Sequence, residues 1–234
     1  MAIRKLLSIG VSAWIGLSGA FWGATAVAAT ITGTVVANGP PAKSAPREGG
    51  AYSGLRYKFA ERIDYQHLTD FVVYIDQPLA APKDGGDAPV ATITQRDVSF
   101  EPHVMPIVVG SKVRWPNADD IFHNVFSMSE AKEFDLGLYT TERVPVITFS
   151  QVGQVDVFCS IHSKMHCIIL VLPNRCFAKA DRRGRYLIQN VPAGTYRLKA
   201  WQERLPGKVQ MVTVPADGKV EADFTLGLSD LPKY

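Results

Sequence analysis

The sequence has little cysteine, little net charge and, after its first 29 residues, almost no helical periodicity. Its 25 Lys and Arg against 22 Asp and Glu give a formal net charge of +3. The densest basic cluster is DRRGR at residues 181–185. Proteins that bind nucleic acid through phosphates need a larger basic patch. The composition therefore argues against that class, and we interpret DRRGR as a charged turn.

Short β-branched and aromatic runs take the place of helical patterns, for example FVVYID at 71–76 and CIILVLP at 167–173. Turn sequences such as NGPP, DGGDAP and PADG separate these runs. Many short strands at close spacing are typical of β-sandwiches and barrels. We therefore expect an all-β fold. The one helical turn that we expect is SMSEAKEF at 127–134, which begins with a Ser cap.

The first 29 residues resemble a secretory signal peptide. Arg4 and Lys5 precede a long apolar run that ends in the small residues ATAVAA, a pattern that favours cleavage after Ala28 or Ala29. An uncleaved membrane anchor is the alternative, because the run approaches the length of a membrane span. In both cases we expect export to the periplasm. Without Arg4 and Lys5 the remaining chain is close to neutral.

Three cysteines are an odd number for an exported chain, so at least one thiol is not in an internal disulfide. Cys159 is the candidate for a metal ligand, because His162 and Met165 follow it closely. Cys167 and Cys176 then remain as a disulfide pair or as two buried free thiols. The sequence leaves these two alternatives open.

Soft and borderline metal ligands are concentrated in VFCSIHSKMHC at 157–167. Cys159, His162 and Met165 occur there at intervals of three, and His123 lies upstream in FHNVFS. Two imidazoles and a thiolate in a trigonal plane, with a weak axial thioether, suit both Cu(I) and Cu(II). The sequence therefore predicts one copper ion held by His123, Cys159, His162 and Met165.

Residues 98–172 resemble a cupredoxin of the plastocyanin and amicyanin type. The resemblance rests on FEPHVMPIVVGSKVRW before the first ligand, on HNVFS, on a Gly five residues before FC, and on the C-x-x-H-x-x-M spacing. It implies a Greek-key β-sandwich with a type 1 copper ion. It also implies that Asn124 hydrogen-bonds across to the cysteine loop. Phe122 and Phe158 are expected to pack around the ion or in the ordinary core.

Three further histidines fall outside this pattern. His103 follows FEP and is an alternative or extra ligand at the rim of the site. His166 follows Met165 directly, and strand alternation is expected to turn it away from the metal, although it remains a candidate extra ligand. His67 is remote in the sequence, and we expect it on the surface.

Residues 178–201 resemble a carboxypeptidase-regulatory-like, or transthyretin-like, β-sandwich module, through a D-x-x-G turn, alternating apolar residues and VPAGTY. Its expected opening strand is found instead in ITGTVVANGPPA near residue 30. We therefore expect the cupredoxin domain to be inserted into this module, with tandem order as the alternative. The predicted divisions are 1–29 (signal peptide), 30–90 (N-terminal β segment), 91–173 (cupredoxin domain) and 174–234 (second β module).

These features predict a periplasmic electron carrier rather than an enzyme, because no general base stands beside the predicted metal ligands. The partner would be a redox protein such as a periplasmic dehydrogenase or cytochrome. Resemblance to amicyanin implies a methylamine-utilisation pathway by analogy, although Lys164 in the ligand loop differs from the apolar loops of that family. Two alternatives are a copper-handling protein without a redox partner and a surface module that recognises carbohydrate or protein.

Overall fold

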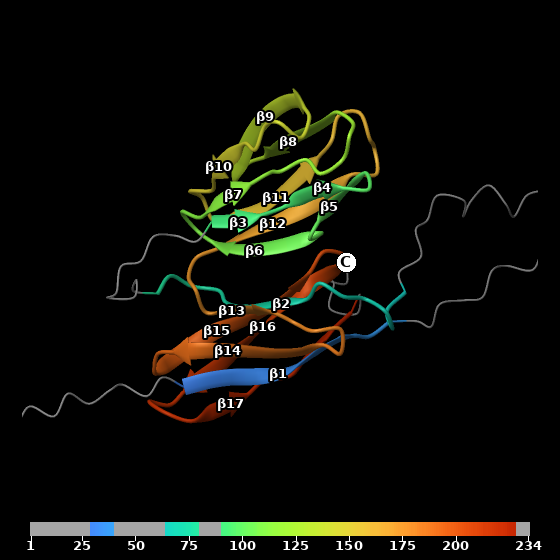
Figure 1. The fold of residues 1–234 in the computed structure, drawn as a ribbon. Coiled ribbons are helices and arrows are strands. Elements are labelled where there is room, and N and C mark those ends of the chain that lie inside the picture. The colour runs from blue at the N-terminus through green and yellow to red at the C-terminus, as the bar shows by residue number, and fades with distance from the viewer. Residues whose placement is uncertain (1–28, 40–63, 80–89, 228–234) are drawn as a thin grey trace, which may run out of the picture.

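The computed structural model describes residues 29–39, 64–79 and 90–227. Within these ranges the chain is all-β, as the sequence predicts, and it forms two stacked sandwiches (Figure 1). Among the described residues, no helix has the length and apolar character needed to cross a membrane. Residues 1–28 of the predicted signal peptide lie outside the described part of the chain.

The first body, which we call the ligand sandwich, contains the predicted copper ligands. Its strands are β3 (Val90–Thr92), β4 (Thr94–Arg96), β5 (Ser99–Glu101), β6 (Val104–Val108), β7 (Lys112–Arg114), β8 (His123–Ser129), β9 (Lys132–Tyr139), β10 (Val146–Thr148), β11 (Gly153–Phe158) and β12 (His166–Leu172). One sheet has the order β6-β12-β11-β8-β9 and the facing sheet has the order β10-β7-β3. Strand β6 is parallel to β12, and the other neighbours in the larger sheet are antiparallel.

The second body, which we call the framework sandwich, is built from both ends of the described chain. Its strands are β1 (Ala29–Ala37), β2 (Val72–Ile75), β13 (Phe177–Lys179), β14 (Arg185–Val191), β15 (Gly194–Gln202), β16 (Leu205–Val214), β17 (Lys219–Glu221) and β18 (Phe224–Leu226). One sheet places β1 between β14 and β17, with β18 also paired to β1, and the other has the order β13-β2-β15-β16. The ligand sandwich is therefore formed by the chain segment between β2 and β13.

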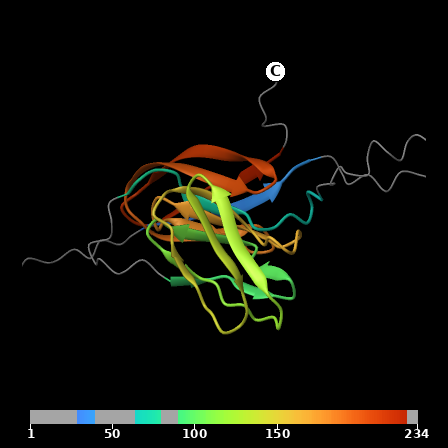
Figure 2. The ribbon, with the colours of Figure 1, turned by 90° about the horizontal axis from the view of Figure 1, so that it is seen from above.

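Strand β1, at the start of the described chain, pairs with strands near its end. It pairs antiparallel with β14, where Ile31 lies opposite Ile188, and parallel with β17 and β18. Figure 1 shows β1 in blue among the orange and red strands, and Figure 2 shows the same neighbours from above. This pairing is the one that an inserted ligand sandwich requires, and residues 31–36 do not pair with β6 or β7.

The sheets stack so that β12 is buried on both faces. Its Cys167, Ile169 and Val171 enter the core of the ligand sandwich, and the alternate residues Ile168, Leu170 and Leu172 enter an apolar layer against the framework sandwich. On the framework side that layer contains Val72 and Tyr74 of β2. A strand covered on both faces reads as a continuous apolar run, which explains CIILVL.

Cys167 and Cys176 do not form the alternative disulfide, because both are free and buried. Cys167 lies in the core of the ligand sandwich and Cys176 in the core of the framework sandwich, with the β13-β2-β15-β16 sheet and its apolar layer between these cores. Burial, and secondarily the charge of Asp156, raises the pKa of the Cys167 thiol. Burial also raises the pKa of Cys176, so both remain protonated thiols.

The predicted helical turn at 127–134 is wrong. The segment is a β-hairpin in which Ser129 lies opposite Lys132. The Ser127 hydroxyl accepts a hydrogen bond from the Ser129 amide, and the Ser129 hydroxyl accepts one from the Asp156 amide of β11. Pairing within the sheet has therefore overridden a local helical preference.

Candidate metal centre

The predicted copper ligands lie at one end of three neighbouring strands. His123 is the first residue of β8, Cys159 follows the last residue of β11, and Met165 immediately precedes β12. His162 lies in the loop between β11 and β12. Because β11 is antiparallel to both β8 and β12, its end lies beside the starts of its neighbours. The sheet thus brings residues that are distant in sequence to one edge.

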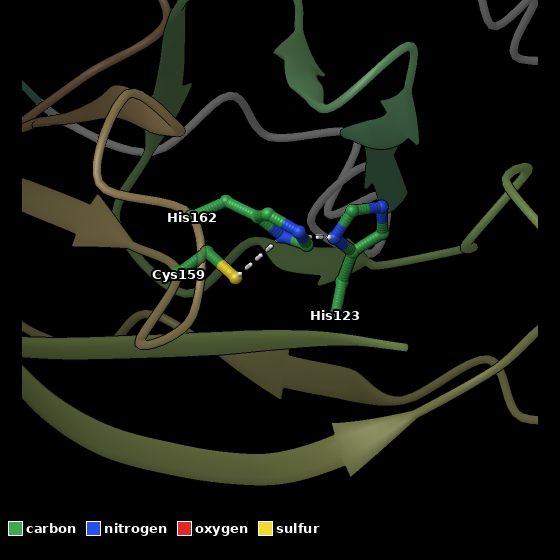
Figure 3. Close-up of side chains that lie close together, drawn as sticks. All are labelled: His123, Cys159 and His162. Atoms are coloured by element: carbon green, nitrogen blue, oxygen red, sulfur yellow. Dashed lines mark hydrogen bonds between the residues drawn. The ribbon is translucent and has the colours of Figure 1, made fainter. Parts of the chain in front are cut away.

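Two imidazole nitrogens and the thiol sulfur converge at this edge (Figure 3). The Nδ1 atoms of His123 and His162 are 3.0 Å apart, and the Cys159 Sγ lies 3.7 Å from the His162 Nδ1. All three donor atoms lie within 4.8 Å of one another. Ligands bound to one ion at about 2.0 Å for nitrogen and about 2.3 Å for sulfur have separations of this size. The donor set and its spacing therefore fit a borderline transition metal such as copper.

The ligand loop is closed by backbone hydrogen bonds between its own residues. The Cys159 amide donates to the Met165 carbonyl at 3.3 Å, and the Met165 amide donates to the His162 carbonyl at 3.0 Å. The Met165 side chain is fully buried in the same apolar cluster as Cys159. This burial is consistent with the axial role that the sequence assigns to its thioether.

Asp119 fixes the orientation of the His123 ring. The His123 Nε2 is 2.8 Å from a carboxylate oxygen of Asp119, and the His123 side chain is fully buried. When Nε2–H donates to the carboxylate, the Nδ1 lone pair of neutral His123 points toward Cys159 and His162. An outer carboxylate of this kind commonly holds metal-binding histidines in one tautomer and makes them more basic ligands.

The Asp119 carboxylate is itself held in the ionised form. Partial burial opposes ionisation, but hydrogen bonds from the Val98 amide, the His123 ring and the Asp97 amide outweigh it and lower the pKa of Asp119. Asp97 and Val98 both have positive φ angles, of 52° and 55°. The tight turn before β5 therefore directs two amides at Asp119, which in turn positions the His123 ring.

Asn124 contacts the cysteine through its backbone rather than through its side chain. Its amide N–H donates to the Cys159 Sγ at 3.4 Å, while its side-chain nitrogen donates to Asp135 on β9 at 2.7 Å. The predicted side-chain bond across to the cysteine loop is thus replaced by a backbone one. This backbone hydrogen bond holds the Cys159 sulfur beside the start of β8.

The two aromatic residues predicted around the ion are exposed instead. Phe122 is 57% exposed and Phe158 is 38% exposed. Phe122 precedes buried His123, so strand alternation turns it outward. Phe158 packs against Phe126 and stacks on His166 at a ring separation of 4.7 Å. Neither residue belongs to the apolar core around Cys159.

His103 and His166 are not grouped with the three converging ligands. They belong to a separate cluster with Glu203 of the framework sandwich. His166 begins β12 next to buried Cys167, and alternation directs it to the opposite face of the sheet from that residue, as predicted. His67 is on the surface, with 79% of its side chain exposed, and it pairs with Asp64.

Comparisons with known proteins give partial likenesses. The family described as "Polysaccharide lyase family 4, domain II" matches residues 177–222. No curated protein matches the sequence.

Three solved structures illustrate the structural likenesses. A Cu-containing nitrite reductase from Thermus scotoductus SA-01 has 27% identity and a TM-score of 0.35, with 41% of this chain and 25% of that chain covered. A purple cupredoxin from Nitrosopumilus maritimus has 24% identity and a TM-score of 0.32, with coverages of 35% and 98%. A reduced Cu(I) form of an amicyanin mutant has 20% identity and a TM-score of 0.33, with coverages of 44% and 98%.

The first of these structures is matched over only a quarter of its length. With TM-scores of this size, the interpretation of the metal centre rests on the side chains described above and not on the neighbours. Sequence reasoning missed Asp119, which lies four positions before His123 in the loop leading into β8, and Asp135, which lies on the strand β9 that pairs with β8. The sequence NADD before FHNV was the only available signal for Asp119.

Proposed function

We propose that the ligand sandwich binds one copper ion through His123, Cys159, His162 and Met165 and transfers single electrons. The observation that carries this proposal is the convergence of two Nδ1 atoms and one sulfur within 4.8 Å, with the outer nitrogen of His123 held by Asp119. A copper ion in such a site would cycle between Cu(I) and Cu(II), which transfers one electron. The chain supplies a buried, preorganised set of donors for it.

His162 is the proposed route by which the electron leaves. It is the half-exposed member of the three converging ligands, whereas His123 and Cys159 are buried. The residues beside the ligands in the sequence add exposed apolar side chains: Ile161 is 51% exposed and Ile121 45% exposed. Together with exposed Phe122 they offer an apolar surface on which a redox partner can dock, and exposed Lys164 favours an acidic partner.

The test is reversible redox cycling of the copper-loaded full chain. We expect one copper per chain and an intense thiolate-to-copper charge-transfer band that bleaches on reduction and returns on oxidation. Cys159→Ser should lose the band. Cys176→Ser, in the other core, should retain it and controls for loss of a buried thiol.

The spectrum also separates the copper-handling alternative. A colourless Cu(I) form that cannot be reoxidised without losing copper would replace electron transfer by metal handling. Both functions use the same side chains, so only the redox behaviour distinguishes them.

The cellular setting is part of the proposal. A signal peptide at residues 1–29 would place the chain in the periplasm, where a dehydrogenase or cytochrome would exchange electrons with it. A role in methylamine utilisation rests on analogy alone. Mass spectrometry of the exported protein tests the location, with a new N-terminus at Ala29 or Thr30 as the expected result.

Recognition of carbohydrate by the framework sandwich is the second candidate. The observation that favours it is the match of residues 177–222 to a domain of polysaccharide lyases. Binding of polysaccharide to the Cys159→Ser chain, with unchanged affinity, would support this function independently of copper.

A further inference from the structure

A second cluster of metal-binding side chains joins the two sandwiches. His103 lies in the loop between β5 and β6, His166 is the first residue of β12, and Glu203 lies in the turn between β15 and β16. Each offers one donor atom, and these atoms lie within 4.8 Å of one another. Two of the three residues come from the ligand sandwich and the third comes from the framework sandwich.

The hydrogen bonds of His103 turn its free lone pair toward Glu203. Its Nδ1 is 3.1 Å from the carbonyl oxygen of His166, which can only accept, so Nδ1 carries the proton. In neutral His103 the Nε2 is then an acceptor, and it faces a carboxylate oxygen of Glu203 at 2.8 Å. Two acceptors at this distance require either a metal cation or a proton between them.

His166 has a similar arrangement. Its Nε2 is 3.2 Å from the Asp156 carboxylate, and its Nδ1 is 3.8 Å from the other oxygen of Glu203. Stacking on Phe158 fixes the plane of the His166 ring. Each imidazole therefore has one nitrogen held by an acceptor and the other directed at the same carboxylate, which is the outer support that metal-bound histidines usually have.

We propose that His103, His166 and Glu203 bind a divalent transition-metal ion of the Zn²⁺ class, separate from the copper ion. Two imidazoles and one carboxylate are a ligand set that Zn²⁺ takes, with a remaining position for water. The side chains are 40%, 23% and 26% exposed for His103, His166 and Glu203, so an ion can enter from solvent. The bound ion cross-links the two sandwiches.

The alternative that the same geometry allows is a metal-free ion pair, in which His103 is doubly protonated and bound to Glu203. Zinc binding distinguishes the two. An ion pair needs no metal, whereas the proposed site should take up one Zn²⁺ per chain and hold it more tightly than a surface histidine does.

The experiment titrates Zn²⁺ into the copper-loaded full chain against a chromophoric chelator. We expect one Zn²⁺ per chain without loss of copper. Glu203→Gln and His103→Gln should each weaken zinc binding by at least about tenfold. His67→Gln, which removes an exposed histidine that also pairs with a carboxylate, is the matched control and should bind zinc as the unsubstituted chain does.

Thermal unfolding supplies a second measurement that is independent of the chelator. Added Zn²⁺ should raise the melting temperature of the unsubstituted chain and of His67→Gln, because a ligand that binds only the folded state stabilises it. Glu203→Gln should show a smaller rise at the same Zn²⁺ concentration, because its zinc affinity is lower. Absence of zinc binding, displacement of copper by zinc, or equal zinc affinity in Glu203→Gln and the control would each overturn the proposal. None of these results depends on whether the copper centre transfers electrons.

Discussion

At the scale of single residues, the metal centre depends on an acidic group that is not itself one of the proposed ligands. Asp119 accepts hydrogen bonds from the Asp97 and Val98 amides and holds the Nε2 of His123. The ring cannot rotate without breaking this bond in a buried site. Copper affinity should therefore respond to Asp119 even though its carboxylate is on the far side of the ring from the sulfur.

Asp119→Asn should weaken copper binding by about 10-fold to 100-fold, as losses of outer carboxylates on metal-bound histidines do. The amide oxygen can still accept a hydrogen bond from the His123 Nε2, but the negative charge of the carboxylate beside that nitrogen is gone. Competition with a Cu(II) chelator measures the change. Asp120→Asn removes an exposed neighbouring carboxylate and should have no effect; equal losses in both variants would contradict the role of Asp119.

The sequence could predict that His123, Cys159 and His162 lie together, as they do in the structure, but not what surrounds them. The spacing of Cys159, His162 and Met165 on one loop constrains them to a common site, so residue type and interval are sufficient. Asp119 and the exposure of Phe122 depend on the direction of single turns. Asp97 and Val98 have positive φ angles, and this turn directs their amides at Asp119. Because neither residue is a glycine, the sequence contains no pattern that predicts this geometry.

At the scale of elements, β1 is the strand that closes the framework sandwich. It is parallel to β17 and β18 and antiparallel to β14. Gly33 in β1 has the carbonyl of Ala222 and the carboxylate of Asp223 immediately beside it, in the space that a Cβ would occupy. Asp223 also accepts hydrogen bonds from the amide and hydroxyl of Thr34 at 2.6 and 2.8 Å. Residues far apart in sequence thus hold this edge of the sheet together.

Gly33→Ala should destabilise the chain by about 1–3 kcal/mol, because the added methyl group is forced against a backbone carbonyl that cannot move independently. Thermal unfolding measures the loss. Gly207→Ala is the matched control: its added methyl group would meet the end of the flexible Lys199 side chain at 3.1 Å and the Ala200 carbonyl at 3.2 Å, so the loss should be smaller. An equal loss in both variants would contradict the close approach at Gly33.

Asp223 should make this edge of the sheet sensitive to acid. Hydrogen bonds from the Thr34 amide and hydroxyl lower the pKa of Asp223 below its ordinary value of 3.8. A carboxyl group whose pKa is lower in the folded chain stabilises the fold above the unfolded pKa, and this contribution is lost as the pH falls through the folded pKa. Asp223→Asn should therefore lower the melting temperature at pH 7, and the difference from the unsubstituted chain should shrink toward pH 2. A difference that does not change with pH would contradict this assignment.

At the scale of the whole molecule, four of the five sheets that the described residues form stack with three apolar layers between them. The short apolar runs predict the all-β class. The expected opening strand near residue 30 predicts that the last strands of the chain pack with its first one. The sequence did not show that β2 and β12 would face each other across a shared apolar layer. A run that is apolar at every position indicates that both faces of the strand are covered, but it does not identify the segments that cover them.

The stack also explains why the disulfide alternative could not be decided beforehand. Cys167 and Cys176 are only nine positions apart in the sequence, yet β12 and the following turn carry them into the cores of different sandwiches. Distance along the chain gives no measure of separation across a sheet. The His103, His166 and Glu203 cluster was hidden for the same reason, since Glu203 belongs to the other sandwich.

The most direct test of the account is X-ray absorption spectroscopy of copper bound to the full chain, with the Cys159→Ser chain for comparison. The account predicts one sulfur at short bonding distance together with two imidazole nitrogens in the unsubstituted chain, and loss of that sulfur in the variant. Copper surrounded only by nitrogen and oxygen in the unsubstituted chain would contradict it.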